Sequence, residues 1–165
     1  MKIIEKFLSG LEQKVDKDLI FKFFIVFSRF EYALKRAKYL KSNNNRVQPD
    51  WDVFALKLNR NLVQETSPEI KDAIDYFKNN PPKQQIVTPN GDLGWNIVGN
   101  TQQLNNKQLL EYIRRVRNNL FHGGKFQDGP VAEPARNEDL LKNSLIILNS
   151  CLEIDANVKF FFLDI

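Results

Sequence analysis

The sequence contains very few of the residues that bind metals or form disulfide bonds. Its 165 residues include one cysteine, Cys151, and one histidine, His122. A single cysteine excludes a disulfide within the chain and any metal site built from several cysteines. Because zinc needs several such ligands in one neighbourhood, we expect no metal and no cofactor. Cys151 falls within an apolar helical pattern and is expected in the core.

Long hydrophobic runs are also missing. The longest apolar stretch, LIFKFFIVF at residues 19–27, is about half as long as a membrane span and is interrupted by Lys22. The first residues, MKIIEKFLSGLEQKV, resemble a signal sequence only briefly, because Glu5 and Glu12 break the apolar pattern. These features predict a cytoplasmic protein with no membrane partner.

The chain carries only a small excess of positive charge. Lysine and arginine number 24 against 20 aspartates and glutamates, so the net charge is +4 with histidine neutral. This balance permits a polyanionic partner such as RNA without requiring one, and a solvated surface with a slight lysine excess explains it equally well. The length is typical of one domain, which we place at residues 1–165.

Apolar residues recur at helical spacing through most of the chain. The strongest pattern predicts a helix over residues 17–41, capped by Asp16 or Asp18, with an apolar stripe that includes Phe23 and Phe27. Further helices are predicted over 3–15, from Asp50 through Leu62, from Ser67 to Asn80, from Asn105 or Asn106 to Gly123, and from Asn137 past Leu152. The expected fold class is therefore all-α, a bundle of five or six helices.

Three segments lack this pattern. SNNNRVQP, residues 42–49, is predicted to be a polar loop. Residues 80–104 contain the turn signal Asn90-Gly91 and are predicted to form an ordered loop or a small hairpin, which Trp95 anchors to the helices. The tail VKFFFLDI is apolar, and its pattern fits a helix, a strand or a docked extension.

The stretch RRVRNNLFHGGK, residues 114–125, crowds polar side chains around the only histidine. Gly123 and Gly124 predict that the helix stops directly after it. A cation at a helix C-terminus is favoured by the helix dipole, so helix capping alone explains a histidine here. Against that explanation, Asn118 and Asn119 are poor helix formers close to the helix end, and the chain offers no competing site such as a glycine-rich phosphate loop.

The residue types in this stretch suit one chemistry. Histidine titrates near neutral pH and transfers protons to or from hydroxyl groups. An arginine fork binds phosphate and stabilises the charge that develops when a fifth oxygen bonds to phosphorus. His122 and a nearby arginine therefore indicate metal-free cleavage of RNA through its own 2′-hydroxyl.

At these residues the sequence resembles the HEPN superfamily (higher eukaryotes and prokaryotes nucleotide-binding). The family signature is an arginine, a polar residue, a short gap and a histidine near a helix end, matched here by Arg117, Asn118, the residues NLF and His122. The wider similarity to small stand-alone prokaryotic members covers RFEYALKRAKYL, PDWDVFA, RRVRNNLFHGGKF and ARNEDLL. The resemblance implies a HEPN-like helical bundle in which Arg117, Asn118 and His122 are catalytic.

The resemblance also implies an activity and its partners. HEPN proteins include metal-independent endoribonucleases that act as dimers in toxin–antitoxin, CRISPR or anti-phage systems. We therefore expect RNA as substrate, a homodimer with a composite active site, and an antitoxin or defence-system protein as regulator. Because the family also contains members that do not cleave RNA, the alternative is a non-catalytic module that binds a nucleotide, RNA or a protein. A purely structural subunit is a third reading.

Two arginines compete for the catalytic position. Arg115 and His122 lie nearly on one face of an ideal helix, whereas Arg117 and His122 are rotated by roughly 140°. The family's polar residue follows Arg117 directly, while Val116 follows Arg115. We assign catalysis to Arg117, because a distorted helix end or a second chain removes the geometric objection.

The remaining assignments concern residues around the signature. Arg114, Arg115 and Lys125 are predicted to contact RNA, although a solvated lysine explains Lys125 equally well. Glu31 shares the apolar stripe of the 17–41 helix, and a carboxylate there needs either a partner or access to water. If that helix packs near the signature helix, Glu31 orients Arg117 or His122, in keeping with the acidic or polar residue that family members often carry at this place.

Overall fold

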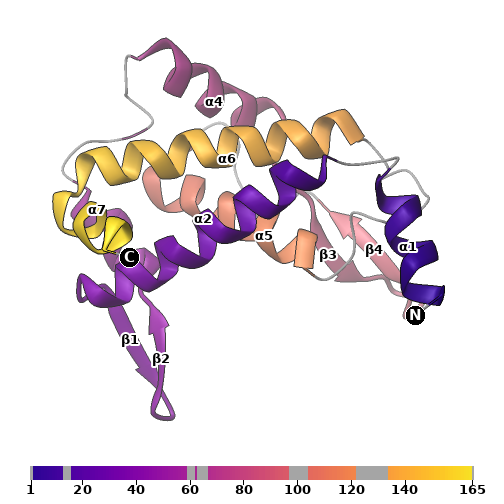
Figure 1. Ribbon diagram of the computed structural model, residues 1–165, viewed down its shortest axis with the longest axis horizontal. Helices are drawn as coiled ribbons and strands as arrows, with labels where there is room; N and C mark the ends of the chain where they lie inside the picture. The colour runs from indigo at the N-terminus through magenta and orange to yellow at the C-terminus, as the bar shows by residue number, and fades with distance from the viewer. Residues whose placement is uncertain are drawn as a thin grey trace.

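The computed structural model describes residues 2–12, 16–58, 62, 67–96, 104–121 and 134–164. Helices dominate these residues, and two short antiparallel hairpins accompany them (Figure 1). The helices are α1 (Lys2–Glu12), α2 (Lys17–Arg36), α3 (Trp51–Lys57), α4 (Pro68–Asn79), α5 (Asn106–Phe121), α6 (Pro134–Ile154) and α7 (Ala156–Leu163). The strands are β1 (Leu40–Asn43), β2 (Arg46–Pro49), β3 (Gln84–Val87) and β4 (Leu93–Asn96). None of the described helices has both the length and the apolar character that a membrane crossing requires.

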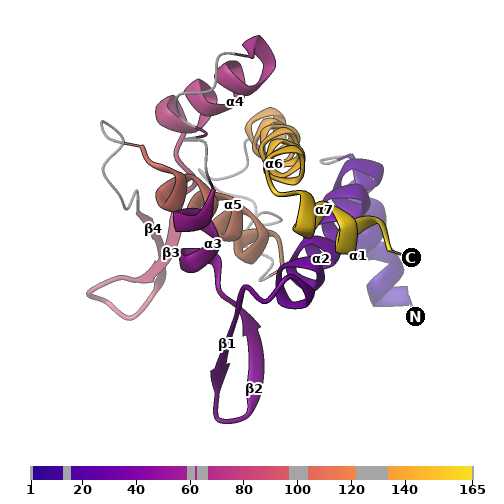
Figure 2. The ribbon, with the colours of Figure 1, turned by 90° about the vertical axis from the view of Figure 1, so that its left-hand side faces the viewer.

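The core is rich in aromatic rings. Phe23, Phe27 and Phe30 of α2 are buried, and the indole of Trp51 stacks on Phe27 and Phe30 with centroid distances of 5.6 and 5.5 Å. Helix α2 packs against α6 and α7, α4 packs against α6, and α3 packs against α5. Figure 2 shows α5 and α3 on one side of the molecule and α2 with α7 on the other. Side-chain contacts nevertheless join α5, which carries the signature arginines, to α2: the rings of Phe121 and Phe24 lie 5.3 Å apart, and Arg117 reaches Glu31.

Helix α2 ends five residues before the predicted boundary at residue 41. Its start is as expected, because the Asp16 carboxylate accepts hydrogen bonds from the Asp18 and Leu19 amides. At its end the Tyr39 amide donates to the Leu34 carbonyl, and Lys38 adopts a left-handed φ of 72°. That conformation turns the chain out of the helix, so the helical prediction for 37–41 is wrong.

Residues 40–49, which the sequence suggested were partly helix and partly loop, form the β1–β2 hairpin. Leu40 pairs with Pro49, and Asn43 pairs with Arg46. Asn44 and Asn45 make the turn with positive φ values of 48° and 63°, a conformation that asparagine tolerates better than most residues. The fold is consequently mostly helical but not purely all-α.

Most other boundaries follow local signals in the sequence, but the helix predicted from Asp50 through Leu62 ends at Lys57, because Leu58 is extended. Asp50 caps α3, and the Asn105 carboxamide accepts from the Gln108 amide at the start of α5. Pro68 occupies the first turn of α4, whereas the Ser67 side chain makes no capping hydrogen bond. Helix α6 starts at Pro134, three residues before the predicted Asn137. The apolar tail forms the helix α7.

The second hairpin, β3–β4, lies in the segment that was predicted to be an ordered loop or a hairpin. Gln84 pairs with Asn96, and Val87 pairs with Leu93. Gly91 closes the turn with a φ of 83°, which explains why glycine follows Asn90. Strand β3 lies against α5, so this hairpin borders the signature helix.

Candidate functional site

Arg117 lies on the side of α5 that faces α2. Its Nη2 atom is 3.4 Å from Oε1 of Glu31, an ion pair between two helices that are far apart in the sequence. The guanidinium carbon also lies 5.1 Å from the ring centroid of Phe27. A cation over an aromatic face is attracted by the ring electrons, so Phe27 and Glu31 together orient this arginine.

Glu31 is itself held in place by a buried indole. The Trp51 Nε1–H donates to Glu31 Oε1 over 3.3 Å, so Trp51 and Arg117 share one carboxylate oxygen. Trp51 is only 3% exposed. A carboxylate on the apolar stripe of α2 requires a partner. Glu31 has two, Trp51 on α3 and Arg117 on α5.

The Arg117–Glu31 pair still reaches solvent. The two side chains are 31% and 25% exposed, respectively. Glu31 is the only hydrogen-bonding partner of Arg117 within the described part of the chain, whereas a guanidinium has five N–H donors. Donors of Arg117 therefore remain available for a phosphate.

Arg115 occupies a different environment. Its side chain is 9% exposed, its Nη1 donates to the Pro82 carbonyl over 3.2 Å, and its Nη2 pairs with Glu111 at 2.7 Å. Its guanidinium also lies 5.4 Å from the ring centroid of Tyr112. These contacts fasten the segment before β3 to α5, which is a structural role; the predicted RNA contact of Arg115 stays a prediction.

Arg114 and Asn118 lie on the β3 side of α5. They line a groove of about 430 Å³ together with Gln84 and Gln85 of β3. Asn118 is exposed, whereas its neighbour Asn119 is buried and donates to the Lys83 carbonyl over 2.6 Å. Because successive helical residues are rotated by about 100°, the adjacent signature residues Arg117 and Asn118 face different neighbours.

His122, Lys125 and the two glycines between them lie outside the described residues. The last described residue of α5 is Phe121, whose ring centroid lies 5.3 Å from that of Phe24 in α2. Both residues are exposed, at 51% and 39%. Helix α5 thus ends beside the first half of α2, one turn beyond Arg117.

Among the described residues, no group of three histidine, cysteine, aspartate or glutamate side chains could hold a metal ion. Cys151 is fully buried, and burial raises the pKa of its thiol far above the usual range. This thiol is consequently neutral and unsuited to nucleophilic chemistry.

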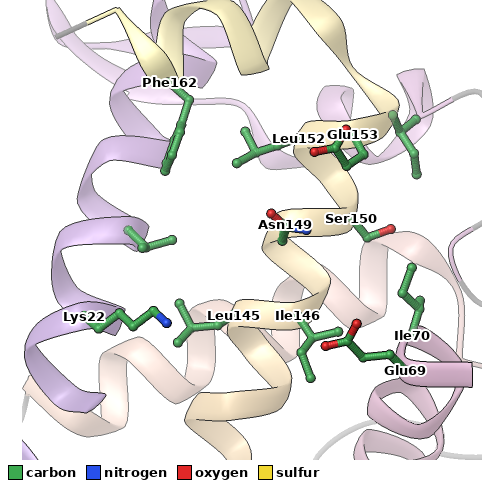
Figure 3. Close-up of a pocket in the computed structure, with 12 residues that line it drawn as sticks. Lys22, Glu69, Ile70, Leu145, Ile146, Asn149, Ser150, Leu152, Glu153 and Phe162 are labelled. Carbon is green, nitrogen blue, oxygen red and sulfur yellow. The ribbon is translucent and has the colours of Figure 1, made fainter. Parts of the chain in front are cut away.

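A larger pocket of about 780 Å³ lies elsewhere, between α2, α4, α6 and α7. Figure 3 shows Leu145 and Leu152 of α6 in its wall, with Lys22 and Glu69 on opposite sides. It contains none of the residues that the sequence assigned to the site, and no motif in the sequence indicated it.

Comparison of the chain with family models, curated proteins and solved structures finds no significant match. The assignment to the HEPN superfamily therefore stays a prediction that depends on the signature residues and their surroundings.

Proposed function

We propose that this protein is a HEPN-type endoribonuclease that cleaves RNA without a metal, with Arg117 and His122 as catalytic residues. The observation that carries the proposal is the Arg117–Glu31 pair. A partly exposed arginine is oriented by a carboxylate and an aromatic ring, and an indole holds that carboxylate, only five residues before the single histidine. This arrangement positions the guanidinium and still leaves N–H donors for a phosphate.

The proposed reaction uses the RNA's own 2′-hydroxyl. His122 accepts the proton of this hydroxyl as its oxygen attacks the adjacent phosphorus. The bond from phosphorus to the 5′-oxygen breaks, and that oxygen takes up a proton as it leaves. Arg117 binds the non-bridging oxygens and stabilises the extra negative charge of the five-coordinate phosphorus. The products are a 2′,3′-cyclic phosphate and a 5′-hydroxyl.

A homodimer accounts best for both proton transfers, because one His122 from each copy can face one phosphate. The described surface near Arg117 suits such contact. Phe21, Phe24 and Ile25 of α2 and Phe121 of α5 are 67%, 39%, 47% and 51% exposed. Apolar side chains gathered in this way mark interaction surfaces, and a two-fold axis through them brings two copies of Arg117 together.

A second candidate function is nucleotide or RNA binding without cleavage. The groove between α5 and β3 favours it, because residues with carboxamide and guanidinium groups line it beside one acidic residue, Glu111: Gln84, Gln85, Arg114, Arg115, Asn118 and Asn119. Carboxamides hydrogen-bond base edges, and a guanidinium binds phosphate. In either case, a defence or toxin–antitoxin setting with a separate regulator is part of the proposal.

An end-group assay separates these functions. The purified protein is incubated in EDTA with a single-stranded RNA and with a DNA of the same sequence. We expect cleavage of the RNA alone, with 2′,3′-cyclic phosphate ends. Retention of both intact strands with measurable RNA binding would support the binding module, and strict magnesium dependence or equal cutting of DNA would exclude the proposed mechanism.

A further inference from the structure

The segment that leaves α2 carries charge of one sign only. Residues 35–49 contain three lysines, two arginines and neither aspartate nor glutamate. Arg36 is occupied, because it stacks on Phe161 at 4.8 Å and donates to the Tyr32 hydroxyl. Lys35 is half-buried on α2, and the three cations on or next to the hairpin, Lys38, Lys41 and Arg46, are exposed.

The β1–β2 hairpin projects from the helices at the end of α2, as Figures 1 and 2 both show. Its register pairs Lys41 with Gln48 and Asn43 with Arg46. Directly opposed residues share a face, and residues two apart on one strand also share it. Lys41, Arg46 and Gln48 therefore lie on one polar, basic face, while Leu40 and Val47 belong to the other.

The base of the hairpin is firmly attached to the core. The Tyr39 carbonyl accepts from the Asp50 amide at 2.9 Å, and the Tyr39 hydroxyl donates to Asp155 at 2.7 Å. The Tyr39 ring meets Phe54 edge-on at 5.2 Å. Burial, assisted by the hydrogen bond to Asp155, raises the pKa of Tyr39 to about 12, so the donor stays protonated at physiological pH.

The hairpin is also connected to the candidate site. Strand β2 leads through Asp50 directly into Trp51, whose indole donates to Glu31, the partner of Arg117. Only Asp50 separates the hairpin from Trp51 in the sequence. A ligand bound along the basic face is therefore held by a segment that adjoins the residues around Arg117, the arginine proposed to bind the cleaved phosphate.

The chemistry of the basic face selects the partner. Exposed cations without an acidic partner bind phosphates, and the side chain of Gln48 on the same face can hydrogen-bond sugar hydroxyls. Residues 40–49 contain no aromatic side chain on which an unpaired base could stack. A rigid ribbon of this kind fits the backbone and the shallow minor groove of helical RNA better than a single strand.

We infer that the β1–β2 hairpin is an arm that binds the double-helical part of a structured RNA substrate through its phosphates. This inference rests on the proposed function, and it names the class of RNA that the site receives. Cleavage then takes place in an unpaired segment next to the helix held by the arm, since a loose strand gives the 2′-hydroxyl the freedom to align with its phosphate.

The test compares binding of a stem-loop RNA by the wild-type protein and by Lys41→Gln/Arg46→Gln, as fluorescence anisotropy at several salt concentrations. The control, Lys6→Gln/Lys71→Gln, removes the same charge from exposed positions on α1 and α4. If both arm cations contact phosphates, the slope of log K against log salt falls by about 2 in the arm variant. The slope of the control stays at the wild-type value.

Cleavage assays separate this inference from the proposed function. The arm variant should show a raised KM for the stem-loop RNA, an unchanged kcat, and wild-type cleavage of an unstructured strand. Wild-type binding and cleavage of the stem-loop by the arm variant would overturn the arm while leaving the ribonuclease in place. Three further results would overturn the arm. The control variant could lose as much RNA binding as the arm variant, or the wild-type protein could bind a DNA duplex more tightly than the RNA. The arm variant could also keep its RNA binding and lose only the binding to anionic lipid vesicles.

Discussion

Two arginines only two residues apart on α5, and so on different sides of it, show how differently one helix can use the same side chain. Arg115 is 9% exposed and is bound to the Pro82 carbonyl and to Glu111. Arg117 is 31% exposed and is paired with Glu31 at 3.4 Å. Arg115 fastens the segment before β3 to the helix, whereas Arg117 has only Glu31 as a hydrogen-bonding partner among the described residues and remains partly exposed. The proposal therefore assigns the phosphate to the second.

The sharpest test of this comparison is Arg117→Ala. Losing the group that stabilises developing phosphate charge is expected to lower the cleavage rate by about 10²- to 10³-fold. The unfolding free energy should change by at most about 1 kcal/mol, because partly exposed ion pairs contribute little. Single-turnover kinetics and urea denaturation measure the two effects. Cleavage by this variant at the wild-type rate would show that Arg117 is not the catalytic arginine.

Arg115→Ala should show the opposite profile. Removing this guanidinium leaves the buried Pro82 carbonyl with one hydrogen bond fewer, which costs about 1–3 kcal/mol of unfolding free energy. The salt dependence of RNA binding should stay unchanged. If Arg115 contacts a phosphate instead, the salt slope falls by about 1. Loss of turnover in a folded Arg115→Ala variant, with Arg117→Ala active, would show that the signature is aligned on the wrong arginine.

Glu31→Gln isolates the orienting charge. The amide keeps the size of the side chain and an oxygen for Trp51, but it removes the negative charge that attracts Arg117. We expect the cleavage rate to fall by about 10-fold, which corresponds to a rise of about 1.4 kcal/mol in the activation free energy. The pH profile should keep its shape, since the proton carrier is unchanged. An Arg117→Ala/Glu31→Gln double variant no slower than Arg117→Ala alone confirms that Glu31 acts through Arg117.

The smallest effect is expected from Trp51→Phe. Phenylalanine keeps the stacking on Phe27 and Phe30 but cannot donate to Glu31. One hydrogen bond contributes about 0.5–1.5 kcal/mol, so the cleavage rate should fall a few-fold. Trp95→Phe, in β4 and away from Glu31, is the matched control and should leave the rate unchanged. Equal losses in both variants would argue against a role for the indole donor.

The sequence predicted the helices well because their signals are local. Apolar stripes located most helices, and caps such as Asp16 and Asp50 marked their starts. The β1–β2 hairpin was missed for a physical reason. Its strands are exposed on both faces, so they show no alternation of apolar and polar residues, and only the paired asparagines of the turn hinted at it.

The candidate site was predictable only in part. The apolar stripe that contains Glu31, together with the family resemblance, predicted that Glu31 orients Arg117 or His122 if the two helices pack together, and the structure places Glu31 against Arg117. Trp51 was not expected there, because a contact between α3 and α2 depends on how the hairpin turns the chain. The binding of Arg115 to the Pro82 carbonyl could not be inferred either, since no local pattern reports which backbone group will lie beside a side chain.

Cleavage of a single-stranded RNA in EDTA by His122→Ala, compared with the wild-type protein, tests the central claim most directly. His122 is the only histidine, so no second imidazole in the chain can carry the proton. The wild-type protein should produce 2′,3′-cyclic phosphate ends, and the variant should fold normally but cleave about 10²- to 10⁴-fold more slowly. Cleavage by His122→Ala at the wild-type rate would contradict the account and leave the histidine as no more than the end of a helix.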